Sequence, residues 1–145
     1  MNQYESLKLD NQLCFPLYAT SREVIKLYRP YLDALDLTYT QYIALMVLWE
    51  HGTMSVRDMG KKLFLDSGTL TPVLKSMESK GFVVRRRCTQ DERMVLVELT
   101  QKGEELKDQA LVIPTELAKC VSLNADETLQ LYRLLYKLLG VESPY

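Results

Sequence analysis

The spacing of apolar residues between Ser55 and Gly103 constrains the fold of this chain more than any other feature. Apolar residues recur at helical spacing in the first half of this stretch and then alternate, as they do in β-strands. Ser55 is a good N-cap for a short first helix, and Asp66 and Ser67, in a turn, are good N-caps for a second. Gly81 tolerates the positive φ that often ends a helix. The first helix is expected to place its apolar residues inward: Val56, Met59, Leu63 and Phe64. The stretch therefore predicts two short helices, a β-hairpin and the start of another helix.

The second predicted helix has an apolar side and a polar side. Its apolar residues lie at positions i, i+3, i+4 and i+7: Leu70, Val73, Leu74 and Met77. Its other side carries short polar groups and one cation: Ser67, Thr69, Thr71, Lys75 and Ser76. Side chains of this kind contact base edges and phosphates, and the DNA-binding residues expected here are Asp66, Ser67, Thr69, Thr71 and Lys75. We therefore expect this helix, which begins near Asp66, to be the recognition helix of a winged helix-turn-helix.

The predicted hairpin is the wing, with strands at 82–87 and 94–99 and a polar loop at 88–93. Between Lys75 and Arg93 there are six basic and three acidic residues, a net charge of +3 in a chain of net charge −1. A charged hairpin is usually only solvated, but this localised positive charge favours a surface that faces phosphates. The expected DNA-binding residues of the wing are Arg85, Arg86, Arg87, Asp91 and Arg93. Asp91 is expected to orient Arg93 at the minor groove. Residues alternate faces in a strand, so only some of the three consecutive arginines can reach DNA.

The flanking segments are predicted to be helical and to form a subunit interface. Helical spacing predicts helices at 9–27, 38–50, 101–120 and 125–139. The first is expected to end before Pro30, and the third to be bent or interrupted at Pro114. The chain ends carry more apolar residues than one face of a small domain needs, which predicts a homodimer. The expected fold is a single domain, 1–145, mainly α with a small β-hairpin (α+β), with its DNA-binding part at 38–100 and dimerisation helices at 1–35 and 101–145.

Composition limits the function further. Hydrophobic residues make up 47% and charged residues 26%, as in soluble globular proteins. No apolar run is long enough to span a membrane, and MNQYESLKLD lacks the pattern of a signal peptide, so we expect a cytoplasmic protein without a membrane partner. Three cysteines are expected to be reduced there, and with the single His51 they make no usual zinc set. His51, at a helix end, fits an exposed capping position better than a catalytic pair with cysteine. No metal, cofactor or enzyme activity is expected.

The order of elements, with Asp91-Glu92-Arg93 in the wing, resembles the MarR family of dimeric repressors. Three longer segments, LDNQLCFPLYATSRE, YTQYIALMVLWEHG and LDSGTLTPVLKSMESKG, resemble its organic-hydroperoxide-sensing (OhrR-type) branch. The resemblance covers nearly the whole chain. It implies a homodimer bound to pseudo-palindromic double-stranded operator DNA, which is released when an organic hydroperoxide oxidises a cysteine.

The resemblance implies that Cys14 is the redox-sensing cysteine. In this branch two tyrosines of the partner subunit hold the cysteine, and the matching residues are Tyr28 and Tyr39; Tyr18 is a further candidate for the same pocket. Phenol O–H groups favour the thiolate, which attacks the peroxide O–O bond and becomes a sulfenic acid. Without the resemblance, a lone helical cysteine is more often a small packing residue. Pro16 fits best in the first turn of a helix and would place Cys14 near the N-terminus of that helix.

The segment IPTELAKC resembles family members in which a second cysteine resolves the sulfenic acid as an intersubunit disulfide. This makes Cys120 the candidate resolving cysteine, with core packing beside Leu117 and Val121 as the alternative. Cys88 has no evident partner. Two other functions remain open: a MarR-type repressor relieved by a small phenolic or anionic ligand without redox chemistry, and a thiol peroxidase. The chain lacks a Pro-x-x-x-Thr-x-x-Cys motif, which speaks against the peroxidase.

Overall fold

The computed structural model describes residues 2–145, which divide into two compact units, one that ends at Ile113 and a second that spans Pro114–Tyr145. The elements of the first unit are two short 3-10 helices (Glu5–Leu7 and Leu9–Asn11), α1 (Cys14–Ala34), α2 (Tyr39–His51), β1 (Met54–Ser55), α3 (Val56–Leu63), α4 (Ser67–Ser79), β2 (Val83–Arg87), β3 (Val95–Leu99) and α5 (Gln101–Ala110). Helix α6 (Val112–Cys120) crosses the division, and α7 (Ala125–Leu139) follows it. The observed class is the expected one: mostly helical, with a small antiparallel sheet.

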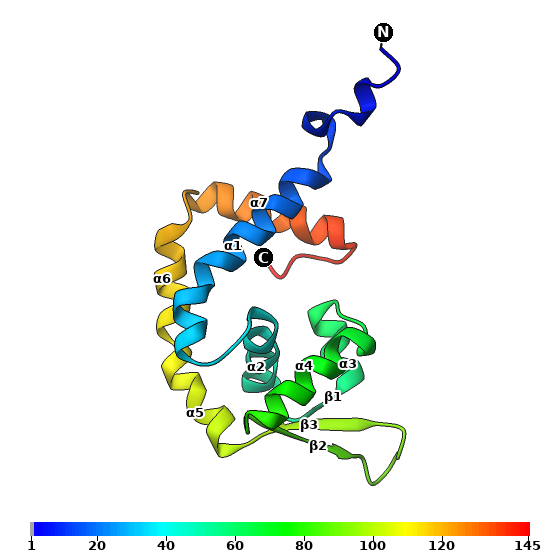
Figure 1. Ribbon diagram of the computed structural model, residues 1–145, viewed down its shortest axis with the longest axis vertical. Helices are drawn as coiled ribbons and strands as arrows, with labels where there is room; N and C mark the ends of the chain where they lie inside the picture. Colours follow the sequence, from blue (N-terminus) through cyan, green and yellow to red (C-terminus); the bar gives the residue numbers. More distant parts are fainter. Residues whose placement is uncertain (1) are drawn as a thin grey trace. The chain divides into compact units, whose positions relative to one another are not determined.

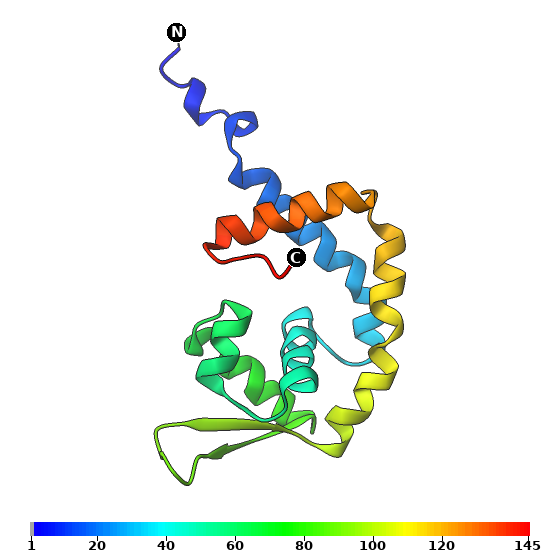
Figure 2. The ribbon, with the colours of Figure 1, turned by 180° about the vertical axis from the view of Figure 1, so that it is seen from behind.

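Helices α2, α3 and α4 pack together and against the sheet, as Figures 1 and 2 show from opposite sides. Apart from Ile113 of α6, the largest side chains with almost no exposure come from these elements: Leu45, Leu48, Met59, Leu70, Leu74, Met77, Val83 and Val97. Three of the four residues predicted to form the apolar stripe of α4 are fully buried, and Val73 is partly buried. The predicted apolar stripe of α4 is therefore confirmed.

Helix α1 differs from the prediction at both ends. It begins at Cys14 rather than Leu9, and it continues through Pro30 to Ala34 instead of ending before the proline. A proline inside a helix removes one N–H hydrogen bond and crowds the preceding turn. The last turn of α1 compensates by placing Leu32 in the core, and Leu37 of the following corner is buried too. Tertiary packing of this kind commonly outweighs a local helix-breaking signal.

The predicted helix caps of the DNA-binding part are present. The side chain of Thr38 accepts a hydrogen bond from the N–H of Gln41, whose side chain accepts from the N–H of Thr38, so α2 begins with a capping box. The hydroxyl of Ser55 and the carboxylate of Asp66 cap α3 and α4 in the same way, accepting from backbone N–H groups three residues later. These caps explain why the predicted helix starts agree with the observed ones to within a residue.

Two details around α3 and α4 correct the sequence-based expectations. Phe64 does not lie on the inner side of α3: it is the C-cap, with a left-handed φ of 56°, and its side chain is 51% exposed. The left-handed backbone turns the chain after α3 and points the ring away from the core. The turn itself is shorter than expected, because α4 begins at Ser67 and Gly68 lies in its first turn. At the other end, Gly81 has the expected positive φ, 82°.

The sheet is antiparallel, with the strand order β1-β3-β2. Val83 pairs with Leu99 and Arg87 with Val95, so the hairpin has the expected register, and each strand begins one residue later than predicted. Strand β1, which pairs Met54 with Val97, was not predicted because two residues are too few to show alternation.

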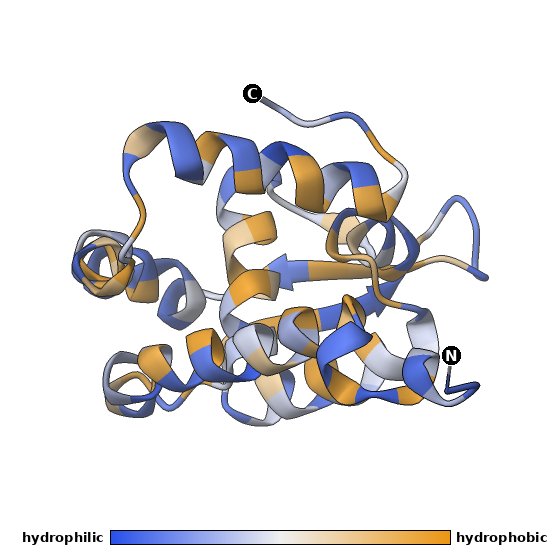
Figure 3. Cartoon of the chain, turned by 90° about the horizontal axis from the view of Figure 1, so that it is seen from above, coloured by the Kyte–Doolittle hydropathy of each residue, from blue (hydrophilic) through white to orange (hydrophobic). Residues whose placement is uncertain are grey.

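The C-terminal helices follow the prediction closely. The helical segment predicted for 101–120 is interrupted at Leu111, three residues before Pro114. Pro114 has no N–H to donate to the carbonyl of Ala110, and its ring crowds that carbonyl, which explains the break. Helix α7 has the predicted bounds, starts with a capping box between Asn124 and Glu127, and ends at Gly140. Apolar residues recur along it, yet none of them is buried in this chain (Figure 3). No helix within residues 2–145 is both long and apolar enough to cross a membrane.

Candidate nucleic-acid interface and thiol site

A groove of about 520 Å³ lies between α3, α4 and the hairpin. Five residues predicted to bind DNA line it: Ser67, Thr71, Arg85, Asp91 and Arg93. Arg57, in the first turn of α3, lines it as well, and the sequence analysis missed this residue. The sequence did contain a signal for Arg57. It is a cation two residues after the N-cap Ser55, and so it lies at the N-terminal end of α3, which faces the wing. The groove brings the recognition helix and the wing together on one basic surface.

Arg93 is the most exposed charged side chain of the wing among those in ion pairs, with 93% of it accessible. Its backbone N–H and its Nε both donate to Oδ1 of Asp91, at 3.1 and 3.3 Å. Asp91 therefore orients Arg93, as expected, while the guanidinium keeps further N–H donors directed at solvent. The contact of Arg93 with the minor groove stays a prediction.

The three consecutive arginines of β2 have different partners. Arg85 forms an ion pair with Glu78 at 3.3 Å, Arg86 pairs with Glu98 at 3.3 Å, and Arg87 donates to the carbonyl of Glu92 at 2.9 Å. Arg85 lines the groove and is only 23% exposed. Its Nε is buried and has no hydrogen-bond partner within residues 2–145. Of the three, Arg85 is the one that lines the groove, and its contact with DNA stays a prediction.

Glu78 joins the recognition helix to the wing. Its carboxylate accepts from the backbone N–H of Arg85 at 2.8 Å as well as from the guanidinium. The backbone hydrogen bond is the main reason why the pKa of Glu78 is lowered, followed by the side-chain hydrogen bond and the charge of Arg85. The carboxylate therefore stays ionised near neutral pH and holds β2 against α4.

Most of the polar side of α4 is accessible as predicted, but Ser76 is half-buried and its hydroxyl accepts a hydrogen bond from Nε2 of Gln41. Ser67, Thr69 and Lys75 are exposed and Thr71 is half-buried, so their side chains are accessible to DNA. Asp66 has a structural role as well, because its carboxylate caps α4 by accepting a hydrogen bond from the N–H of Thr69. That hydrogen bond lowers the pKa of Asp66. Lys80 was counted with the basic surface, but its ammonium is turned to Asp36 and Gln41 instead.

Cys14 is the first residue of α1, and its side chain is exposed. The position that Pro16 indicated is therefore confirmed, and the helix macrodipole stabilises negative charge at such a position. The neighbouring apolar side chains of Leu13, Phe15 and Leu17 are exposed as well. The thiol therefore lies next to apolar side chains that are exposed in this chain.

Tyr28 and Tyr39 lie together, with ring centroids 5.0 Å apart in an edge-on arrangement. Tyr42 completes the cluster at 5.9 Å from Tyr28, a member that the sequence analysis missed although it follows Tyr39 by one helical turn. Burial raises the pKa of all three phenols. They therefore remain protonated at neutral pH and can donate a hydrogen bond. Tyr18 lies elsewhere: it is exposed, with the guanidinium of Arg22 5.5 Å from its ring centre.

Helical geometry separates Cys14 from Tyr28 within one chain. The two residues lie on the same helix, and a rise of 1.5 Å per residue places them about 21 Å apart along its axis. A single chain therefore does not bring the thiol to the phenol that is expected to support it. A contact between Cys14 and a phenol of a second copy stays a prediction.

The other two cysteines occupy different environments. Cys120 is the last residue of α6 and is exposed, with its thiol 3.6 Å from the carbonyl of Glu116. It is thus not packed in the core of this chain, contrary to the alternative considered above. Cys88 is half-buried at the base of the wing, where its N–H donates to the carbonyl of Met94. No group of three or more His, Cys, Asp or Glu side chains within residues 2–145 is arranged to hold a metal ion.

Comparisons with known proteins agree with this geometry. Residues 26–110 match the family model described as "Transcriptional regulator SarA/Rot". The organic hydroperoxide resistance transcriptional regulator of Bacillus subtilis is 50% identical over 138 residues, which cover 95% of this chain and 94% of that protein.

Solved structures give the same picture. The structure of reduced AbfR bound to DNA, a protein of Staphylococcus epidermidis, superposes with a TM-score of 0.78 at 34% identity, covering 94% of this chain and 95% of the other. A disulfide form of AbfR gives 0.67 at 32% identity, with 94% and 93% covered. A MarR variant from E. coli in complex with operator DNA gives 0.82 at 27% identity, with 96% and 99% covered.

Proposed function

The chain belongs to the family of transcriptional regulators that the SarA/Rot model describes and to the organic-hydroperoxide-sensing branch of the MarR regulators, and we propose that it is a dimeric repressor that releases operator DNA when an organic hydroperoxide oxidises Cys14. The observation that carries the proposal is an exposed thiol, at the start of a helix lined with exposed apolar side chains, in a chain that also carries a basic DNA-reading groove.

DNA binding is assigned to α4 and the wing. Helix α4 enters the major groove with Thr69, Thr71 and Lys75, and Arg93 reaches the adjacent minor groove. The positions of these side chains around one groove support the assignment. Each chain reads one half-site, so a homodimer binds a pseudo-palindrome with half-sites about 34 Å apart. Exposed apolar residues on α1 and α7 support a homodimer, among them Phe15, Val24, Leu134 and Leu138.

The sensing step takes place at Cys14. Its thiolate sulfur attacks the terminal oxygen of the hydroperoxide, the O–O bond breaks, and the alkoxide leaves with a proton as an alcohol. Cysteine is oxidised to the sulfenic acid, and the peroxide is reduced. Tyr28 and Tyr39 of the second copy donate hydrogen bonds to the sulfur. This is supported by their protonated phenols and by the distance that separates Tyr28 from Cys14 within one chain. The exposed apolar residues beside Cys14 favour an organic peroxide over hydrogen peroxide.

The second step uses Cys120 of the other chain. Its thiolate attacks the sulfenic sulfur, water leaves, and an intersubunit disulfide forms. The exposure of Cys120 at the end of α6 supports this role. A disulfide requires Cα atoms within about 7 Å of each other. Where the reduced cysteines lie farther apart, the helices shift to form the bond and alter the spacing of the two recognition helices.

The test measures DNA affinity before and after one equivalent of cumene hydroperoxide, on a duplex that the reduced protein selects from random-sequence DNA. Wild type is expected to lose at least tenfold in affinity and to run as a covalent dimer on a non-reducing gel. Cys14→Ser is expected to bind DNA normally and to ignore the peroxide. Cys120→Ser is expected to form no covalent dimer, with Cys88→Ser as the matched control.

Three outcomes would contradict parts of the proposal. Peroxide-driven release by Cys14→Ser would exclude the redox mechanism and favour relief by a small ligand. Repeated turnover of peroxide with a thiol reductant, without an effect on DNA binding, would indicate a peroxidase. Release by oxidised Cys120→Ser in the absence of added thiol would show that the sulfenic acid alone operates the switch.

A further inference from the structure

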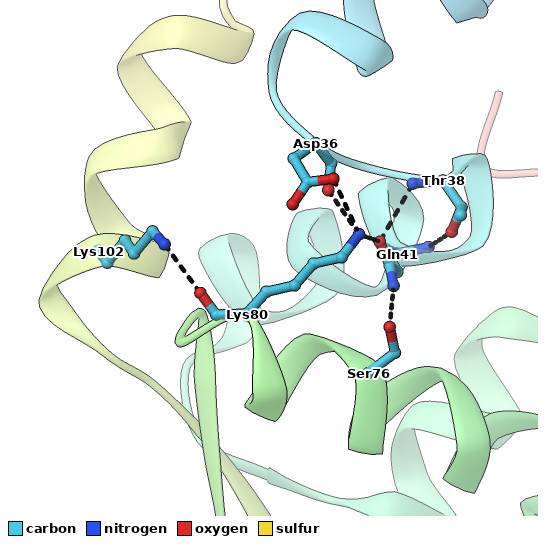
Figure 4. Close-up of polar contacts among 6 residues, drawn as sticks. All are labelled: Asp36, Thr38, Gln41, Ser76, Lys80 and Lys102. Carbon is cyan, nitrogen blue, oxygen red and sulfur yellow. Dashed lines mark hydrogen bonds and ion pairs between the residues drawn. The ribbon is translucent and has the colours of Figure 1, made fainter.

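A polar network centred on the buried Gln41 connects the start of α2 to the end of α4. Figure 4 shows Lys80, the C-cap residue of α4, reaching across to the corner between α1 and α2. Its ammonium donates to the carbonyl of Asp36 at 2.7 Å and to Oε1 of Gln41 at 3.0 Å, and it lies 3.5 Å from the carboxylate of Asp36. The side chain is 24% exposed, so it is far from a solvated surface lysine. All three ammonium donors have an acceptor within reach.

Gln41 is the centre of this network. It is only 3% exposed, and a buried amide is stable only when its hydrogen-bonding groups are satisfied. Its Oε1 accepts from the N–H of Thr38 as well as from Lys80, and its Nε2 donates to the hydroxyl of Ser76 at 3.0 Å. One side chain of α2 is thus bonded to its own helix cap and to two residues of α4.

The position of this network relates it to the thiol site. Tyr39 is the first residue of α2 and follows Thr38, whose N–H and hydroxyl are both bonded to Gln41. A displacement of Tyr39 therefore moves the cap, and the cap is bonded to the same amide that holds Ser76 and Lys80 of α4. The network extends to α5 as well, because Lys102 donates to the carbonyl of Lys80 at 2.8 Å.

We propose that Lys80 and Gln41 are positioning residues of the switch: they fix the end of α4 to the start of α2, so that a change at Tyr39 reaches the recognition helix through their hydrogen bonds. The proposal rests on the proposed function, since it takes Tyr39 as a support of the oxidised cysteine. It assigns to Lys80 a role inside the protein rather than at the DNA. Packing of α2 on α4 without these hydrogen bonds is the competing explanation of how the two helices move together.

The test compares Lys80→Met and Ser76→Ala with wild type. Methionine keeps an apolar stem and loses the ammonium, and alanine removes the acceptor for Gln41 while leaving a small side chain. Ser79→Ala and Lys107→Met are matched controls: both side chains are exposed, Ser79 lies in the last turn of α4, and Lys107 lies on α5. Thermal melting verifies that each variant is folded at the assay temperature, and Ser76→Ala carries the test if Lys80→Met is not.

Three quantities are measured: the affinity of the reduced protein for the selected duplex, the ratio of affinities before and after cumene hydroperoxide, and the rate of Cys14 oxidation by sulfenic-acid trapping. Lys80→Met is expected to weaken reduced binding about tenfold and to reduce the oxidation-dependent ratio at least threefold, with an unchanged oxidation rate. Ser76→Ala is expected to lower the reduced affinity and the oxidation-dependent ratio as well, each by less than Lys80→Met does. The controls are expected to match wild type.

The proposal is overturned if both variants keep the wild-type ratio and the wild-type reduced affinity, because packing then couples the helices. It is also overturned if they alter the rate of Cys14 oxidation as much as the affinity, because the network then acts on the thiol site itself. A failure of the proposed function gives a different result: wild type itself shows no change in affinity on oxidation. In that case the reduced affinities of the two variants still test whether Lys80 and Ser76 position α4.

Discussion

Two regions of this chain differ in how much of their apolar surface one chain buries: the DNA-reading part, from α2 to β3, and the terminal helices α1 and α7. Between α2 and β3 most of the large apolar residues are buried, the helices begin with side-chain caps, and most wing arginines have acidic or carbonyl partners. Helix α7 buries no residue and α1 buries only Leu32, although both are rich in leucine. The difference indicates that the reading part is complete within one chain, whereas the proposed sensor requires a second copy.

The largest expected effect is on the stability of the reading part. Leu74→Ala removes a fully buried side chain of α4 and is expected to lower the free energy of unfolding by about 2–5 kcal/mol, through lost burial and the cavity it leaves. Urea unfolding followed by the fluorescence of Trp49, the single tryptophan, measures it, since Trp49 donates to the carbonyl of Gly103 in the same unit. Leu134→Ala is the comparison on α7. At concentrations where the chain is monomeric, Leu134→Ala should lower the free energy of unfolding much less than Leu74→Ala. Equal losses would contradict the view that α7 contributes little to the stability of one chain.

The next effect is on assembly. Leu134→Glu with Leu138→Glu places two charges on the exposed apolar side of α7 and is expected to prevent dimerisation, because burying an unpaired charge is costly. Loss of the second half-site should weaken DNA binding by about 100-fold or more, since linked binding sites raise affinity by that order. Sedimentation and DNA titration measure both. Lys137→Glu, also exposed on α7, is the control for added negative charge. A double variant that remains dimeric would place the interface elsewhere.

A smaller effect is expected at the wing. Arg93→Ala should weaken DNA binding by about 1–3 kcal/mol without changing the melting temperature, because the side chain is exposed and its ion pair is with Asp91, only two residues earlier in the same loop. The guanidinium of Arg86 pairs with Glu98 of β3, on the opposite face of the sheet from Arg85. Arg86→Ala should therefore weaken DNA binding less than Arg93→Ala. Salt titrations of both variants separate phosphate contacts from other losses. Equal losses for the two arginines would mean that charge alone, rather than the orientation by Asp91, determines the contact.

Local signals were enough to predict most of the fold. Caps such as Thr38 and Asp66 lie next to the helices they start, and the change from helical to alternating spacing marks the hairpin. The path of α1 through Pro30 was not predictable in this way, because it depends on the burial of Leu32 against other elements. The left-handed Phe64 likewise depends on how α3 and α4 pack rather than on the propensity of phenylalanine.

The same distinction between local and long-range contacts applies to the candidate sites. Asp91 and Arg93 are two residues apart, so their pairing could be inferred from the sequence. The ion pair of Glu78 with Arg85 and the contact of Lys80 with Gln41 join separate elements, and only the fold brings them together. The proposed thiol site combines residues of two chains, and for Cys14 and Cys120 the resemblance to a family supplied what residue spacing could not.

The smallest effect concerns pH, and it compares the caps of the two regions. The cap of α4 is the ionisable Asp66, whereas the cap of α7 is Asn124. The hydrogen bond from Thr69 lowers the pKa of Asp66 below its ordinary value of 3.8, so this bond stabilises the folded state above that pH. The stabilisation is lost as the pH falls through the lowered pKa, when the carboxyl becomes protonated.

Hydrogen exchange at the amide of Thr69, corrected for intrinsic rates, should therefore speed up below about pH 4, relative to the amide of Glu127. Asp66→Asn keeps a capping oxygen that does not titrate, so it should remove this pH dependence and leave the start of α4 intact. If Asp66→Asn shows the same acid dependence as wild type, the loss of protection begins elsewhere in the reading part, and the comparison of the two caps fails.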